Sequence, residues 1–296
     1  GSILGVAFAG ILSDRLGRRI TMFIAALLFT VSGIWCTFSG NFQFLVLARF
    51  TGGIGIGIIS IVAPMYISEI AVAQYRGRLV SLYQLAVTLG FLVAYLMNYL
   101  LLSLSKTIFF SSEFLQLVIN REVWRSMFGM EAIPAFIFFI ILFLIPESPR
   151  WLIMHRRENK ASEIYSRIYV SQANIRRQIE GTMSTLSSCT KSEWRTLFEP
   201  GIFKAVIAGL CIAILGQFMG VNAVLYYGPS IFKDAGISDP LFCQVLVGIV
   251  NTVATIIAMF IIDRLGRKKL IYYGVTGMII ALLFISFYFI EKTPLH

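Results

Sequence analysis

The sequence predicts an all-α membrane protein, built as a bundle of membrane-spanning helices. Hydrophobic residues make up 57% of the 296 residues and charged residues only 14%, and the mean hydropathy is +0.81. Apolar stretches of about 20 residues, the length that crosses a bilayer, recur along the chain. An ordinary soluble domain contains roughly 25% charged residues. The composition therefore argues against a soluble enzyme.

Taken in order, the apolar stretches are the predicted spans. They cover residues 1–13, 20–38, 42–69, 79–101, 125–145, 202–232, 240–262 and 270–290. The first stretch is too short to cross a bilayer, and it lacks the basic leader of a signal peptide. The chain also begins with Gly1 rather than Met. We therefore expect it to be a fragment that lacks an N-terminal part.

The net charge of +10 has two possible meanings, nucleic-acid binding or membrane topology. Most Lys and Arg residues fall on alternate loops, with the largest group between residues 147 and 200. Cytoplasmic loops of membrane proteins are enriched in Lys and Arg. The charge thus indicates which loops are cytoplasmic. We expect the lipid bilayer as a partner and no nucleic acid.

A short motif occurs twice, as Asp14-Arg-Leu-Gly-Arg18 and as Asp263-Arg-Leu-Gly-Arg267, each time just after a span. Six predicted spans separate the copies, which favours a duplicated six-helix unit and a parent protein of twelve helices. One helix would then be missing before Gly1 and three after His296. The glycine permits a tight reversal, and Asp and Arg can pair between helix ends. A simple basic turn is the alternative.

This repeat predicts three parts of the chain. Residues 1–146 form the remainder of an N-terminal six-helix bundle (its helices 2–6), residues 147–200 a cytoplasmic helical linker, and residues 201–296 the start of a C-terminal bundle (helices 7–9). Within the linker, isoleucines recur at helical spacing and favour short amphipathic helices; they are Ile164, Ile168, Ile175 and Ile179. Disorder is the alternative for residues 181–192.

Small residues, cysteines and histidines are interpreted as structural. Gly53 and Gly57 place small residues on one helix face, as do Gly1, Gly5 and Ala9, which favours close helix packing over a nucleotide-binding loop. The four cysteines show no paired or metal-ligand spacing, and there are two histidines. They are Cys36, Cys189, Cys211 and Cys243. We expect no cofactor and no metal site.

Two ionisable residues lie inside predicted spans. Arg49 and Glu131 are each about seven residues from the external end of a helix, which places both roughly 10 Å deep. They could meet. A charge at that depth calls for a partner or a function, so they form either a fixed ion pair or a proton site.

Several amides also lie near the middle of predicted spans. They are Gln84, Gln217, Asn222 and Asn251, with Tyr226 and Tyr227 nearby. An amide both donates and accepts hydrogen bonds, as a hydroxyl does, so converging amides favour a neutral polyol over an ion. Gly216 and Gly220 bracket Gln217 and indicate a weakened or discontinuous helix. Hydrogen bonding between helices is the alternative for any single amide.

These residues form motifs of a known family. The motifs are Arg49 and the glycines to Gly57, then Pro64, Tyr66, Glu69 and Arg76-Gly77, the run Pro146-Glu-Ser-Pro-Arg150-Trp-Leu, and the run from Gln217 to Pro229. Together they resemble the sugar porter family of the major facilitator superfamily. The resemblance extends over essentially the whole chain. It implies the helical bundle of that superfamily and transport by alternating access, and no enzyme activity.

The resemblance also implies residue roles. Gln84, Gln217, Asn222 and Asn251 match residues that hydrogen-bond the sugar, and Tyr226 is grouped with them. Arg49 and Glu131 match the partners of a proton-accepting Asp on the family's first helix, which lies outside this chain. The matches to the family's cytoplasmic charge network are Asp14, Arg18, Glu69, Arg76, Glu147, Arg150, Asp263 and Arg267.

We therefore expect part of a proton-coupled transporter of a monosaccharide, pentose or hexose, in the plasma or inner membrane. The partners are the sugar, protons and the bilayer. The fragment by itself is expected to be inactive. A facilitative uniporter is one alternative. The other is a sugar sensor without transport, which Gly216 motivates because the family usually has glutamine there.

Overall fold

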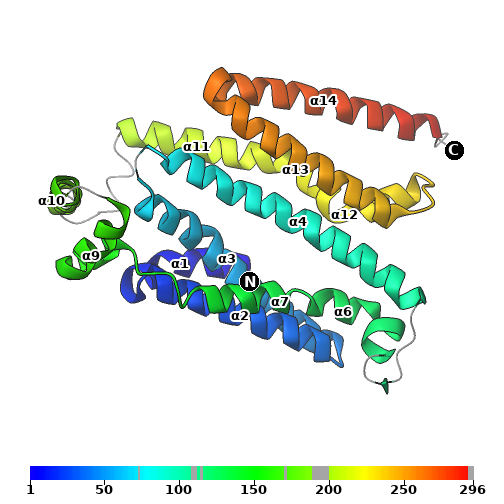
Figure 1. Ribbon diagram of the computed structural model, residues 1–296. Coiled ribbons are helices and arrows are strands. Elements are labelled where there is room, and N and C mark those ends of the chain that lie inside the picture. Colours follow the sequence, from blue (N-terminus) through cyan, green and yellow to red (C-terminus); the bar gives the residue numbers. More distant parts are fainter. Residues whose placement is uncertain (73, 108–111, 114–115, 170–171, 189–199, 293–296) are drawn as a thin grey trace. The chain divides into compact units, whose positions relative to one another are not determined.

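The computed structural model describes residues 1–296 except 73, 108–111, 114–115, 170–171, 189–199 and 293–296, and it describes only the backbone at 173–174, 185–188, 200, 262–265, 267 and 288–292. The described part is helical throughout (Figure 1). It divides into two compact units, the first of residues 1–83 and 96–191 and the second of residues 84–95 and 192–296. The prediction of an all-α membrane protein is confirmed.

Unit 1 begins with three packed helices, α1 (Ser2–Leu16), α2 (Arg18–Phe38) and α3 (Phe42–Ile70). The helix α3 packs against both α1 and α2. The hydrophobic core of unit 1 is built from small and apolar side chains of these helices and from Leu142. They are Ala9, Met22, Ala25, Ala26, Ile58, Val62 and Leu142. Between α1 and α2 the chain reverses at Gly17, whose φ of 99° suits glycine.

The predicted glycine stripes lie where α1 meets α3. A Cβ atom added to Gly5 would meet the backbone oxygen of Ile54, and one added to Gly57 would meet the backbone oxygen of Ser2. Backbones approach this closely only where side chains are absent or small. The prediction of close helix packing at these glycines is confirmed.

The next helices are α4 (Arg76–Thr107), the π-helix η1 (Gln116–Arg121), α6 (Val123–Gly129) and α7 (Ala132–Ile141). The sequence predicts a single span over 125–145, whereas the structure divides it at Met130 and Glu131. Pro134 has no N–H group for the carbonyl of Met130, which instead accepts from Ile133 N–H at 3.3 Å. The proline thus explains the break.

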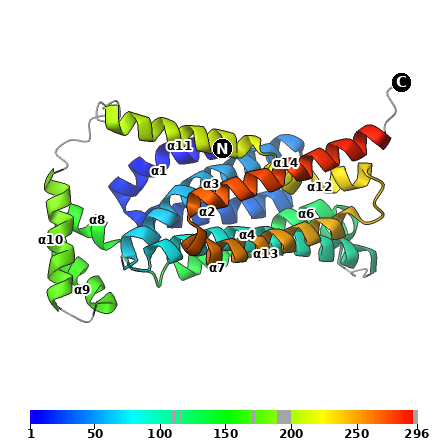
Figure 2. The same cartoon turned by 90° about the horizontal axis from the view of Figure 1, so that it is seen from above.

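Three short helices follow the spans of unit 1. They are α8 (Pro149–Met154), α9 (Glu158–Ile168) and α10 (Gln172–Ser188). Figures 1 and 2 both show α9 and α10 beyond the ends of the long helices of this unit. Ile164, Ile175 and Ile179 pack around Trp151 and Tyr165, so the predicted amphipathic helices are confirmed. The helix α10 continues through Gly181 to Ser188, whereas disorder was the alternative there.

Unit 2 consists of residues 84–95 of α4 together with α11 (Pro200–Phe218), α12 (Val221–Asp234), α13 (Pro240–Leu265) and α14 (Arg267–Lys292). The predicted discontinuity lies at Gly220, in the left-handed region with φ 80°, between α11 and α12. Gly266, in the second copy of the repeated motif, has φ 77°, so the glycine makes the turn in both copies.

Seven segments of the described chain are long and apolar enough to cross a membrane. They agree with the predicted spans from 20–38 onward. With 15 residues, α1 is shorter than a membrane span, as predicted for the first stretch. Many large apolar side chains are exposed on these segments, among them Leu27 at 52% and Phe260 at 76%. Lipid is the medium in which such surfaces are stable.

Candidate functional site

A buried charge cluster lies in unit 1, where α1 meets α2. Arg18 is only 4% exposed, and its Nε and Nη2 atoms donate to the two carboxylate oxygens of Glu69, each at 3.0 Å. The side chain of Glu69, near the end of α3, is 5% exposed. Asp14 pairs with the same guanidinium at 3.2 Å from an exposed position. The two-point contact with Glu69 joins α2 to α3 through charge-assisted hydrogen bonds.

Glu147, which is 129 residues after Arg18 in the sequence, completes this cluster. Its carboxylate accepts the backbone N–H groups of Arg18 at 2.9 Å and Arg19 at 3.2 Å, the first two residues of α2. These N–H groups have no partner inside their own helix, and the helix dipole favours a negative charge there. A Cβ atom at Gly17 would lie 2.5 Å from Glu147 Oε2. Gly17 therefore supplies both the turn and the space for the carboxylate.

The loop between α7 and α8 is joined to this cluster by residues that the sequence analysis named as family motifs without assigning them a role. Ser148 caps α8 and donates to Glu69 Oε2 at 2.5 Å. Trp151 Nε1 donates to the carbonyl of Asp14 at 2.9 Å, and Tyr66 Oη donates to the carbonyl of Pro146 at 2.7 Å. Serine directly before proline is a helix N-cap signal that would have identified Ser148.

The predicted cytoplasmic network is thus partly assembled. Asp14, Arg18, Glu69 and Glu147 come together within unit 1, as described above. Arg76 and Arg150 line a cavity of ≈ 280 Å³ that also borders Glu69 and Tyr165. Neither guanidinium makes an ion pair with a described residue. The side chains of Asp263 and Arg267 lie outside the described side chains.

Tyr165 of α9 is the buried titratable group of this region. It is 6% exposed. Burial raises its pKa above the usual 10.0, while a hydrogen bond with Thr182 acts in the opposite direction. Tyr165 thus holds a neutral phenol between α9 and α10.

The two intramembrane ionisable residues meet. Arg49 Nη1 of α3 donates to Glu131 Oε2 at 2.8 Å, from positions 82 residues apart. The guanidinium carbon of Arg49 also lies 5.0 Å from the centre of the Phe128 ring, at the end of α6. The break between α6 and α7 positions both Glu131 and Phe128. A cation held by one carboxylate and one aromatic face responds directly to the charge of that carboxylate.

The predicted sugar-binding amides are all in unit 2, and two of them, Gln217 and Asn222, are hydrogen-bonded to each other. Asn222 Nδ2 donates to Gln217 Oε1 at 2.6 Å across the Gly220 break. The Tyr226 ring packs edge-on against Phe91 with ring centres 6.3 Å apart, and it is 67% exposed. The side chains of Gln84 and Asn251 make no hydrogen bond with any described residue.

A further amide, Gln244 of α13, was missed. It is 2% exposed and donates through Nε2 to the carbonyl of Leu225 at 2.8 Å, the same carbonyl that accepts from Tyr95 Oη at 2.9 Å. A Cβ atom at Gly228 would clash with this side chain. An amide inside the apolar stretch 240–262 was the signal that could have found it. Gln244 fixes α13 against α12.

The potential metal ligands among the described residues are scattered. No three side chains of His, Cys, Asp or Glu gather there as metal ligands do. Cys36, Cys211 and Cys243 are free thiols. The predicted packing role of Cys189 lies outside the described residues.

Comparison with known proteins identifies the family. The model of the family described as "Sugar (and other) transporter" matches residues 1–294. An arabinose-proton symporter of Bacillus subtilis is 37% identical over 293 residues, covering 98% of this chain and 61% of the relative. A D-xylose-proton symporter of Escherichia coli is 33% identical, covering 99% of this chain and 62% of the relative. The chain thus spans about three fifths of the length of these relatives.

Solved structures of sugar transporters superpose on this chain, in agreement with the family match. The xylose transporter of E. coli in a partially occluded inward-open conformation superposes with a TM-score of 0.82 at 31% identity, over 99% of this chain and 67% of that chain. The proton:xylose symporter bound to 6-bromo-6-deoxy-D-glucose gives 0.78 at 34% identity, over 91% and 58%. Within the family, the runs Met97-Asn98-Tyr99, Trp124-Arg125 and Glu131-Ala-Ile-Pro134 point to the bacterial D-xylose/proton symporter, and these matches confirm that resemblance.

Such proteins are transporters and not enzymes, as the sequence predicts. Helical content, apolar segments and superposition all agree with the family model. The chain is a multi-pass integral membrane protein that belongs to the sugar transporter family of the major facilitator superfamily.

Proposed function

We propose that the chain is part of a transporter that moves a monosaccharide, pentose or hexose, across the cell membrane by alternating access, with protons as the coupling ion. Family membership supports the transport class. The contact between Arg49 and Glu131 supports the coupling. The plasma or inner membrane is part of this proposal.

The sugar would be bound by the amides of unit 2. Once Asn222 donates to Gln217 Oε1, the Gln217 NH₂ group and the Asn222 carbonyl oxygen remain for a ligand. One donor and one acceptor beside each other suit two neighbouring hydroxyl groups. Gln84, Asn251 and Tyr226 would add further polar contacts, and the aromatic ring of Tyr226 can pack against the apolar face of a pyranose.

The proton would act on the Arg49 contact. Protonation of Glu131, or of an acid that competes with it for Arg49, removes the charge that holds the guanidinium. A charge change at one contact can shift a two-state conformational equilibrium only if the contact differs between the states. Because Glu131 lies at the break between α6 and α7, a movement of either helix changes the contact.

The cytoplasmic network would stabilise one of the two states. Asp14, Arg18, Glu69 and Glu147 hold α1, α2, α3 and the α7–α8 loop together. Arg76 and Arg150 are exposed cations beside this cluster, ready to pair with acidic groups elsewhere. Asp263 and Arg267 of the repeated motif are proposed to provide the equivalent charges in the second half.

Transport is tested with the intact protein in proteoliposomes, with labelled D-xylose and D-glucose inside and outside. The expected result is sugar counterflow together with sugar-driven proton movement, read from a pH-sensitive dye. Counterflow without proton movement identifies a uniporter. Sugar binding without counterflow identifies a sensor.

Sugar binding is tested separately by Gln217→Ala and Asn222→Ala. Each change removes a hydrogen-bonding group worth roughly 0.5–1.5 kcal/mol, so the dissociation constant is expected to rise about two- to twelvefold. Gln43→Ala, an exposed amide at the start of α3, is the matched control. Equal affinity in all three variants contradicts the proposed ligands.

A further inference from the structure

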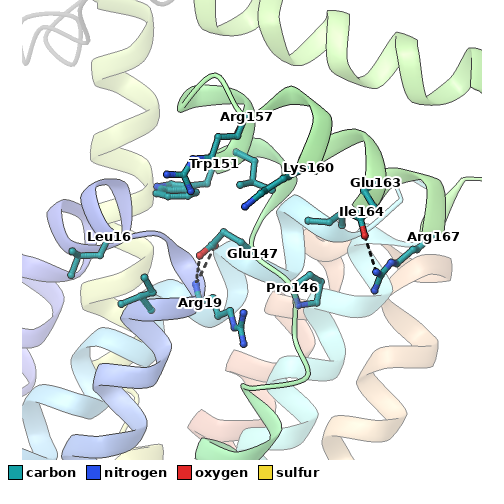
Figure 3. A pocket seen from close by; sticks show the side chains of 12 residues that line it. Leu16, Arg19, Pro146, Glu147, Trp151, Arg157, Lys160, Glu163, Ile164 and Arg167 are labelled. Atoms are coloured by element: carbon teal, nitrogen blue, oxygen red, sulfur yellow. Dashed lines mark hydrogen bonds and ion pairs between the residues drawn. The ribbon is translucent and has the colours of Figure 1, made fainter.

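A second cavity in unit 1 is outside the proposed transport machinery except for one residue, Glu147. It has a volume of ≈ 390 Å³ and lies between the turn from α1 to α2 and the helices α8 and α9 (Figure 3). Apolar side chains form one part of its lining and basic side chains the other. A lining of this kind fits a ligand with both an apolar and an anionic part.

The acidic groups of the cavity already have partners. Glu147 accepts three backbone N–H groups, at 2.8 Å from Ser148 as well as from the start of α2. Glu163 pairs with Arg167 at 3.0 Å, as Figure 3 shows. Glu163 is thus paired within its own helix, and the carboxylate of Glu147, which stays charged, is occupied by backbone N–H donors.

The basic side chains of the cavity differ in whether they have hydrogen-bond or ion-pair partners. The guanidinium of Arg19 donates to the carbonyls of Leu142 at 3.0 Å and Phe143 at 2.9 Å. Arg157 and Lys160, in contrast, have exposed side chains that make no ion pair or hydrogen bond with any described residue. Both line the cavity, above Glu147 in Figure 3. The cavity is therefore lined by two cations, Arg157 and Lys160, that have no ion-pair partner among the described residues.

The apolar part of the lining continues into the membrane-facing surface. Leu16 is 41% exposed and Ile20 is 49% exposed, and both border the cavity. Ile20 is the third residue of α2, a segment apolar enough to span the bilayer. Leu27, two turns further along, is 52% exposed. The cavity thus lies at one end of a segment that is apolar enough to span the bilayer.

We propose that this cavity binds the headgroup of an anionic phospholipid of the cytoplasmic leaflet. The phosphate lies against Arg157 and Lys160, and an acyl chain passes Leu16 at the end of α1 and Ile20 at the start of α2. Basic pockets beside membrane helices on the cytoplasmic side are suited to such headgroups. A soluble phosphate compound would use the cations but leave the apolar wall in water. A zwitterionic lipid would bring its own cation toward Arg157 and Lys160.

The test is lipid binding to the purified protein in detergent, measured by native mass spectrometry. Phosphatidylglycerol, phosphatidylcholine and glycerol phosphate are titrated separately. The expected order is strong retention of phosphatidylglycerol, weak retention of phosphatidylcholine and no measurable retention of glycerol phosphate. The result is independent of sugar transport, because no transport is measured.

The double variant Arg157→Gln/Lys160→Gln is expected to weaken phosphatidylglycerol binding roughly tenfold or more, since each cation near a membrane surface contributes appreciably to anionic lipid affinity. Arg176→Gln/Arg177→Gln on α10 removes the same charge from exposed positions away from the cavity. This control is expected to change the affinity less than twofold. The melting temperature of both variants is measured to show that they are folded.

Two outcomes overturn the proposal. If both double variants weaken phosphatidylglycerol binding equally, the effect is one of net charge and not of this cavity. If glycerol phosphate binds as tightly as phosphatidylglycerol and is lost in the Arg157/Lys160 variant, the cavity is a site for soluble anions and the membrane is not its ligand.

Discussion

Arg18 and Glu69 form a two-point ion pair in which both side chains are about 95% buried, at the ends of two different helices. Asp14 pairs with the same guanidinium but is 61% exposed. One arginine thus has a buried and an exposed acidic partner. Comparing the two carboxylates separates the effect of burial from that of pairing.

Glu69→Ala is expected to destabilise the protein by about 3 kcal/mol or more, because it leaves a buried guanidinium with only the exposed Asp14 as counter-charge. Asp14→Ala removes an exposed partner and is expected to cost at most about 1 kcal/mol. Thermal unfolding in detergent, followed by tryptophan fluorescence, measures both. Equal losses would show that burial is not what makes the Glu69 contact strong.

Glu131→Gln is expected to abolish proton-driven sugar accumulation and to retain counterflow. Glutamine can still accept a hydrogen bond from Arg49, but it has no charge to gain or lose. Accumulation is measured in proteoliposomes with and without a pH gradient. Glu122→Gln, which removes the carboxylate that pairs with Arg125 at the start of α6, is the matched control. Accumulation that persists in Glu131→Gln would contradict the coupling role.

Gly5→Ala and Gly57→Ala are each expected to destabilise the packing of α1 on α3 by about 1–3 kcal/mol, because the added methyl group meets backbone atoms that cannot move aside easily. Gly10→Ala, in the same helix, meets no atom within 4 Å. There, alanine is expected to be neutral or to stabilise the helix by up to about 1 kcal/mol. The measurement is the melting temperature of the three variants. If Gly10→Ala lowers it as much as the other two changes do, the packing argument is refuted.

The burial of Tyr165 predicts how the packing of α9 and α10 responds to alkali. Because burial raises its pKa in the folded state, the neutral phenol contributes stability below pH 10.0, the usual pKa, and this contribution is lost as the pH rises through the higher folded-state value. The melting temperature is therefore expected to fall above about pH 10. The fall should be smaller in Tyr165→Phe and unchanged in Tyr75→Phe, which alters an exposed tyrosine. Identical profiles in all three would contradict the burial effect.

Much of the fold could be predicted from local patterns in the sequence. The length of each apolar stretch determined the membrane segments, and Gly220 marked the break between α11 and α12. The glycine stripes predicted the contact of α1 with α3, because glycine at helical spacing leaves one helix face free for a neighbouring backbone. These properties depend on residues within a few turns of each other.

The sequence predicted which residue types form the candidate site better than it predicted which of these residues contact each other. Depth in the membrane was enough to propose that Arg49 meets Glu131. The mutual hydrogen bond of Gln217 and Asn222 was not predicted, because it depends on how the Gly220 break orients the two side chains. Nothing in the spacing separated those two amides from Gln84 and Asn251.

The sequence by itself determined the class of protein, its membrane segments and the residue types that we propose for sugar and proton binding. Only the tertiary structure decided that Glu69 and not Asp14 is the buried partner of Arg18, that Glu147 caps a helix 129 residues before it, and that Arg157 and Lys160 share a cavity with Ile20. Hydrophobicity and helix periodicity are local, so they can be read along the chain. Burial and the choice of an ionic partner depend on which distant segments meet, and packing alone settles that.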